Sequence, residues 1–114
     1  MNKSGNLFFN WEQLEWIPVD ENIRRKQIWL DKIMHVLVEI KAGAAAPIHQ
    51  HPHEQTGYIL QGTLNVTVKD KEKILQAGEG YLVPPNTPHG VVVIGDTDAL
   101  IFDTFTPVRQ DFLK

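Results

Sequence analysis

Apolar residues recur at every second position along much of this chain, and this period restricts the fold more than any other feature. In TLNVTV (63–68), the aliphatic residues Leu64, Val66 and Val68 fall on one face with polar residues between them, as in a half-buried β-strand. Further β-rich segments are 23–30, 33–40, 56–62, 73–76, 81–84, 91–94 and 99–106. Turn-forming residues separate these segments at roughly ten-residue intervals, which predicts a small all-β barrel or sandwich.

The length of 114 residues is that of one domain. Because the strand pattern begins at residue 23, we expect a β-barrel over 23–114 and an N-terminal extension, 1–22, that packs on it. Within the extension, NWEQLEW (10–16) predicts one helical turn with Asn10 as its cap.

Several functions are disfavoured by what the sequence lacks. The formal net charge is −3 and no block of Lys or Arg stands out, which argues against nucleic acid as a partner. No apolar run is long enough to cross a bilayer, and the polar N-terminus does not have the pattern of an export signal. We therefore expect a cytoplasmic protein. With no cysteine in the chain, any metal site must use nitrogen and oxygen donors.

Three of the five histidines lie in HQHPHEQ (49–55). Alternate residues of a strand share a face, so His49 and His51 are expected to point together into a barrel. Pro52 interrupts regular pairing there and turns the chain, so that Gln55 can approach from another direction. His89 follows in the proline-rich segment PPNTPHG (84–90), which would hold it stiffly at the barrel mouth.

The spacing of these residues resembles the two motifs of the cupin superfamily. The motif positions are Gly43, His49, His51, Gln55 and Gly62, followed by Gly78, Pro84, Asn86 and His89. Gln55 stands where the motif has glutamate, Asn86 where it has glycine, and Val93 where it has asparagine. The resemblance implies a single-domain cupin (RmlC-like) β-barrel, or jelly roll, in which one divalent ion (Zn, Ni, Mn or Fe) is bound by His49, His51, Gln55 and His89.

Such a ligand set of three imidazoles and an amide is neutral, so the ion keeps its double charge and acts as a Lewis acid. Open coordination positions would remain for water or substrate, as in catalytic sites. His53 has no motif position, and we interpret it as supporting the ligands or facing solvent. His35, in an apolar strand, is interpreted as a structural histidine.

The last strand segment, ALIFDTFT (99–106), places an acid on an apolar face. Asp103 shares that face with Ile101 and Phe105, and a carboxylate in an apolar cavity is costly unless it is paired or used. Arg109 follows six residues later and could bind a carboxylate with two hydrogen bonds. Two alternatives remain open: Asp103 and Arg109 take part in catalysis, or they pair with each other.

HQHPHEQ, PPNTPHG and DTFTPVRQDFL together resemble the small cupins of pectin and alginate breakdown, the KdgF type. The resemblance implies an isomerase that converts 4,5-unsaturated monouronates, a class of sugar acid, to linear ketonised forms. In this family, catalysis would fall on Asp103 and Arg109, and substrate binding on Phe105 and Arg109. The alternatives are a metal-dependent cupin dioxygenase and a non-catalytic cupin that binds a sugar or another small molecule.

Apolar residues occur on both faces of the segments 91–94 and 99–106, and three tryptophans lie in the first third of the chain. A barrel needs only one apolar face per strand, so the surplus predicts a buried surface between subunits. We expect a homodimer.

Overall fold

The structure is a computed structural model and describes residues 7–113. The parts of the expected extension and barrel at residues 1–6 and 114 lie outside these residues. The elements are η1 (Trp11–Gln13), β1 (Ile17–Pro18), β2 (Ile23–Trp29), β3 (Met34–Ile40), β4 (Ala45–His49), β5 (Glu54–Gln61), β6 (Thr63–Val68), β7 (Lys71–Gln76), β8 (Gly80–Val83), β9 (His89–Ile94), β10 (Ala99–Thr106) and η2 (Gln110–Leu113). The predicted all-β fold is confirmed.

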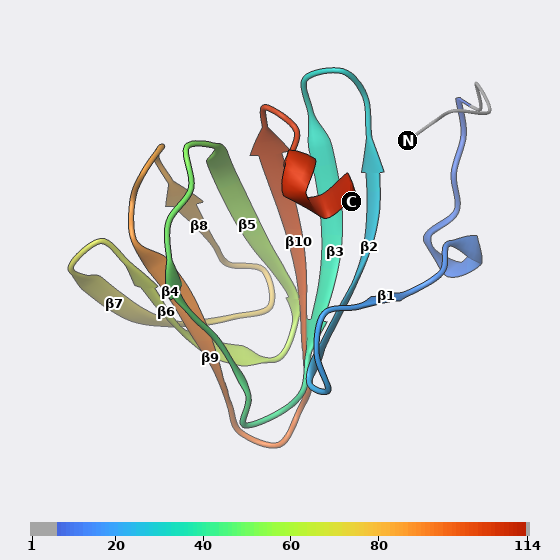
Figure 1. Cartoon of the computed structure of the whole chain (residues 1–114). Coiled ribbons are helices and arrows are strands. Elements are labelled where there is room, and N and C mark those ends of the chain that lie inside the picture. The colour runs from blue at the N-terminus through green and yellow to red at the C-terminus, as the bar shows by residue number, and fades with distance from the viewer. Residues whose placement is uncertain (1–6, 114) are drawn as a thin grey trace.

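The strands form two antiparallel sheets. One has the order β1-β2-β3-β10-β5-β8 and the other the order β4-β9-β6-β7. The sheets come together at one end of the molecule and spread apart at the other (Figure 1). The space between their inner faces therefore widens from a packed core to an open mouth.

Alternation along β10 determines what faces this space. Ala99, Ile101, Asp103 and Phe105 are buried, whereas the residues between them are partly exposed. The sequence therefore placed Asp103 on the correct face. Around it the inner faces supply the aliphatic core, which includes Ile40, Ile59, Leu64, Val66, Val93 and Ile101.

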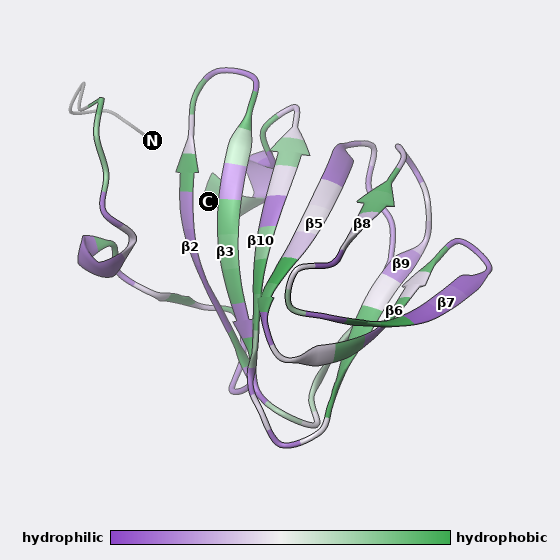
Figure 2. Cartoon of the chain, turned by 180° about the vertical axis from the view of Figure 1, so that it is seen from behind, coloured by the Kyte–Doolittle hydropathy of each residue, from purple (hydrophilic) through white to green (hydrophobic). Residues whose placement is uncertain are grey.

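Hydropathy differs from strand to strand (Figure 2). β3, which has a neighbour on each side, is largely hydrophobic, whereas β7, at the edge of the four-stranded sheet, is largely hydrophilic. Polar side chains on an edge strand discourage pairing with other chains. The KDKEK run (69–73) thus lies in the β6–β7 hairpin and at the start of that edge.

The sequence did not predict two of the strands, β1 and β4, and β4 lies between the predicted strands 33–40 and 56–62. Ala45–His49 forms β4 and pairs with β9, with a register irregularity between Ala46 and His49. Because β4 ends at His49, His51 lies beyond the strand, just before the bend at Pro52 and His53. The argument that His49 and His51 share a strand face is therefore wrong: the turn of the chain brings the two rings together.

Both ends of the described chain pack on β2. Asn10 caps η1, accepting a hydrogen bond from Glu12 N at 2.9 Å, as the sequence predicted. The ammonium group of Lys26 donates to Trp11 O at 2.6 Å. At the C-terminal end, the side-chain amide of Gln27 donates to Phe112 O at 2.8 Å, which fastens η2 to β2.

Candidate metal centre and cavity

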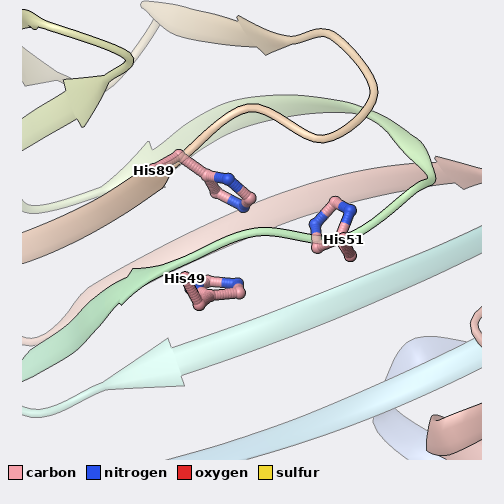
Figure 3. A group of neighbouring side chains, drawn as sticks. All are labelled: His49, His51 and His89. Carbon is pink, nitrogen blue, oxygen red and sulfur yellow. The ribbon is translucent and has the colours of Figure 1, made fainter.

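Three histidine rings converge at the open end of the barrel (Figure 3). His49 ends β4, His89 begins β9, and the two residues are register partners across these strands. His51 reaches the same place from the short segment between β4 and β5. One ligand atom from each ring lies within 4.8 Å of the others, so the three histidines are placed to bind one metal ion.

Hydrogen bonds to the main chain determine which ring nitrogen is available. His49 Nδ1 is bonded to Pro47 O at 2.9 Å, His51 Nδ1 to His53 O at 3.2 Å and His89 Nδ1 to Thr87 O at 2.8 Å. A carbonyl oxygen can only accept, so Nδ1 carries the proton in His49 and His89, and the lone pair of these neutral imidazoles is on Nε2, as metal ligation requires. Both ring nitrogens of His51 face an acceptor, because Oε1 of Gln55 lies 3.0 Å from its Nε2, so the geometry allows its proton on either nitrogen.

The environment keeps two of these rings neutral. Burial lowers the pKa of His89 to about 4, against a raising effect of its hydrogen bond to Thr87, and burial also lowers the pKa of His51. His89 Nε2 is buried without a hydrogen-bond partner, and an unpaired buried polar atom is costly. A divalent cation would use this lone pair, so the residues present fit a divalent metal ion.

Gln55, on the six-stranded sheet, is a fourth candidate ligand beside the three histidines. It lies on β5, is 6% exposed, and its Oε1 atom is 3.0 Å from His51 Nε2. The oxygens of His53 and Gln55 that flank the His51 ring can both only accept, so the single proton of the neutral ring satisfies one of them. With that proton on Nδ1, a cation between Nε2 and the Gln55 oxygen would satisfy the other.

A cavity of about 350 Å³ adjoins the histidines. His49, His89 and Gln55 line it together with Tyr81, Asp103, Phe105, Arg109 and Phe112. Asp103 is 6% exposed, and burial raises the pKa of its carboxyl group to about 7, opposed by hydrogen bonds with Gln55 and Tyr81. The cavity thus combines a metal-binding group, a buried carboxyl and a guanidinium.

Arg109 does not form an ion pair with Asp103. Its Nε and Nη2 atoms donate to the carboxylate of Asp111 at 3.0 and 2.7 Å, and its guanidinium lies 4.3 Å from the ring centroid of Phe112. The alternative that Asp103 and Arg109 simply pair with each other is therefore wrong. Three N–H donors of Arg109 remain beyond those given to Asp111.

The remaining histidines lie outside the group of three. His53 supplies the carbonyl that orients His51, and its ring lies edge-on to that of His51. His35 points away from the cavity and is bonded to Thr104 Oγ1 at 3.0 Å. Tyr81, Asp111 and Phe112 were not singled out from the sequence, because nothing local marks them as neighbours of Asp103 or Arg109.

Comparison with known proteins places this site in a family. The cupin-domain family model matches residues 36–105. The chain belongs to the cupin family. Among curated proteins, the cupin is similar to the pectin degradation protein KdgF of Dickeya dadantii (strain 3937), with 36% identity over 108 residues, 93% of this chain and 97% of that protein.

Solved structures agree with this assignment. An RmlC-like cupin from Shewanella frigidimarina superposes with a TM-score of 0.88 at 32% identity, covering 94% of this cupin and 96% of that chain. KdgF from Halomonas sp. gives a TM-score of 0.85 at 34% identity, with coverages of 95% and 98%. The predicted RmlC-like cupin fold and the resemblance to KdgF proteins are confirmed. The helices among residues 7–113 are all too short to be membrane spans.

Proposed function

We propose that this cupin is a metal-dependent isomerase that opens the ring of 4,5-unsaturated monouronates and yields their linear keto forms. One observation carries the proposal: His49 and His89 of the histidine group, the buried Asp103 and Arg109 line one cavity. Similarity to proteins named KdgF over nearly the whole chain supports the substrate class. At about 350 Å³, the cavity is near the lower end of ligand pockets and suits a monosaccharide.

In this proposal, His49, His51, His89 and Gln55 hold one divalent ion through three Nε2 atoms and an amide oxygen. When bound, the ion supplies Lewis acidity to a substrate oxygen. The neutral ligands leave its charge undamped, and the Nδ1 hydrogen bonds fix the rings in the orientation that ligation needs. No redox change is required of the ion, because the reaction is an isomerisation.

Arg109 binds the substrate carboxylate. Asp111 holds one side of the guanidinium, and the N–H groups on the other side are free to form a charge-assisted pair. The rings of Phe105 and Phe112, 5.2 and 4.3 Å from the guanidinium carbon, limit its movement. Phe105 also forms part of the cavity wall against which the sugar ring packs.

Asp103 transfers the proton. Opening of the ring breaks the bond between the anomeric carbon and the ring oxygen as the anomeric hydroxyl loses its proton. The ring oxygen leaves with the bonding electrons as an enolate, which becomes a ketone when the neighbouring carbon takes up a proton. A single carboxyl group can accept the first proton and return one in the second step, which requires a carboxyl that changes protonation near neutral pH.

The experiment uses the purified, metal-loaded protein and an unsaturated monouronate made by lyase digestion. The proposal predicts metal-dependent loss of the ultraviolet absorbance of the conjugated double bond, together with a linear keto product seen by NMR. Oxygen consumption would instead identify a dioxygenase. Binding of the sugar acid without either change would identify a non-catalytic binding protein. Either of these two outcomes rejects the isomerase.

A further inference from the structure

Tyr81, Gly57 and Asp103 form one row across three neighbouring strands. β5 lies between β8 and β10. Gly57 of β5 pairs with Tyr81 of β8 on one side and with Asp103 of β10 on the other. Because paired residues of adjacent strands share a face, the three positions lie in a line on the inner surface of the sheet.

Gly57 makes this arrangement possible. A Cβ atom added at Gly57 would overlap the Tyr81 ring, with Cε1 at 2.5 Å and the phenol oxygen at 2.6 Å. The ring of Tyr81 therefore lies across the bare backbone of the middle strand. Its hydroxyl group reaches past that strand and donates to Asp103 Oδ1 at 3.2 Å.

The hydroxyl group of Tyr81 has a role separate from that of the ring. The ring packs against the aliphatic core, and a phenylalanine ring would pack in the same way. A buried hydroxyl costs free energy unless it forms a hydrogen bond. Burial and the neighbouring Asp103 raise the pKa of Tyr81 well above its usual value, so the phenol keeps its proton and acts as a donor.

We propose that Tyr81 is a positioning residue, whose hydroxyl fixes Oδ1 of Asp103 so that the other carboxyl oxygen faces the substrate. The inference rests on the proton-transfer role proposed above for Asp103. The carboxyl group of an aspartate can rotate about its side-chain bonds. A displacement of about 1 Å from the reacting atoms can cost on the order of 100-fold in rate. Tyr81 acts through Asp103 and contributes no proton of its own.

The test compares Tyr81→Phe with Tyr58→Phe in the metal-loaded full-length protein. The chain has two tyrosines, and Tyr58 lies on the outer, exposed face of β5, so it is the matched control. For Tyr81→Phe we expect kcat to fall by about 10- to 100-fold with KM and metal content unchanged. Tyr58→Phe should match the wild type. A purely structural hydroxyl would lower the melting temperature without this separation of kcat from KM.

Two further measurements connect the effect to Asp103. In an Asp103→Asn background, Tyr81→Phe should cause no additional loss of kcat, because the group it positions is already inactive. A crystal structure of the Tyr81→Phe protein should show the Asp103 carboxyl turned away from its wild-type orientation. A kcat within about twofold of wild type, or an unmoved carboxyl, would overturn the inference.

The failure of the proposed function can be distinguished from the failure of the inference about Tyr81. If the wild-type protein binds metal but leaves unsaturated monouronates unchanged, the isomerase proposal fails. The crystallographic comparison would still decide whether Tyr81 holds Asp103 in place. If the wild-type protein is active and the carboxyl keeps its orientation in Tyr81→Phe, only the inference about Tyr81 fails.

Discussion

The amide oxygen of Gln55 lies 3.0 Å from Nε2 of His51. Two ligand atoms this close together are both within reach of one bound ion. The two side chains come from separate segments, the chain between β4 and β5 and strand β5 itself. Their separation is therefore a product of the tertiary fold, and it can be tested through the charge of the Gln55 side chain.

Gln55→Glu should bind the ion more tightly and catalyse more slowly. A carboxylate adds attraction for the cation, but it damps the charge that polarises the substrate. The variant should retain more metal than wild type after dialysis against a chelator and should have a lower kcat. Gln55→Leu, which offers no oxygen, should lose metal sooner than wild type. Equal retention by all three proteins would remove Gln55 from the ligand set.

His51→Ala should lose most of the ion, whereas His53→Ala should retain it. His51 contributes a ring nitrogen to the group of three. His53 contributes its main-chain carbonyl, which alanine also has. Metal content measured by plasma emission spectrometry distinguishes the two variants. Wild-type metal content in both variants would contradict the assignment of His51 as a ligand.

Asp103→Asn should keep the fold and the metal but lose proton transfer. Amide and carboxyl groups have nearly the same shape, and general acid–base catalysis is typically worth about 10²- to 10⁴-fold in rate. Turnover and melting temperature should be measured together. If the loss of turnover only follows the loss of folded protein, Asp103 has a structural role and no catalytic one.

Arg109→Lys should raise KM for the sugar acid more than it lowers kcat. Lysine keeps the positive charge but cannot bind a carboxylate with two parallel hydrogen bonds. The neighbouring change Asp111→Asn, which weakens the pair that orients the guanidinium, should have the same effect in milder form. Steady-state kinetics on the three proteins measures this, and an unchanged KM in Arg109→Lys would exclude the carboxylate contact.

The protein should be a homodimer in solution, with a light-scattering mass twice the 13.0 kDa of the single chain. On the outer face of the six-stranded sheet, Tyr58, Leu60 and Leu82 are 46%, 45% and 73% exposed, and an apolar surface of this kind facing water is unusual.

The double substitution Leu60→Lys with Leu82→Lys should give monomers. Ile74→Lys, on β7 of the other sheet and 60% exposed, is the control. A monomeric wild-type protein at micromolar concentration would reject the dimer.

The sequence identified the strands with a strong two-residue period and failed where that period is absent. β10 alternates without interruption, so the buried position of Asp103 could be predicted from its neighbours Ile101 and Phe105. β4 carries alanines and a proline, which have low strand propensity. It pairs because β9 offers an open edge, and pairing of that kind is determined by the tertiary fold.

The sequence predicted which types of residue form the candidate site, but not which of them contact one another. The histidine spacing identified His49, His51 and His89 without a structure. The contact of Tyr81 with Asp103 depends on the register of three strands that are distant in sequence. The pairing of Arg109 with Asp111 depends on the turn into η2. A single sequence holds no local signal for either contact.

The Nδ1 partners of the three imidazoles are peptide carbonyls at positions 47, 53 and 87. Every amino acid has such a carbonyl, so most substitutions at these positions leave the acceptor in place. A site oriented by carboxylate side chains would lose a partner to a single point mutation. The orientation of the three imidazoles can therefore survive substitutions in the residues around them, and related proteins can differ in the rest of the cavity while keeping this arrangement of rings.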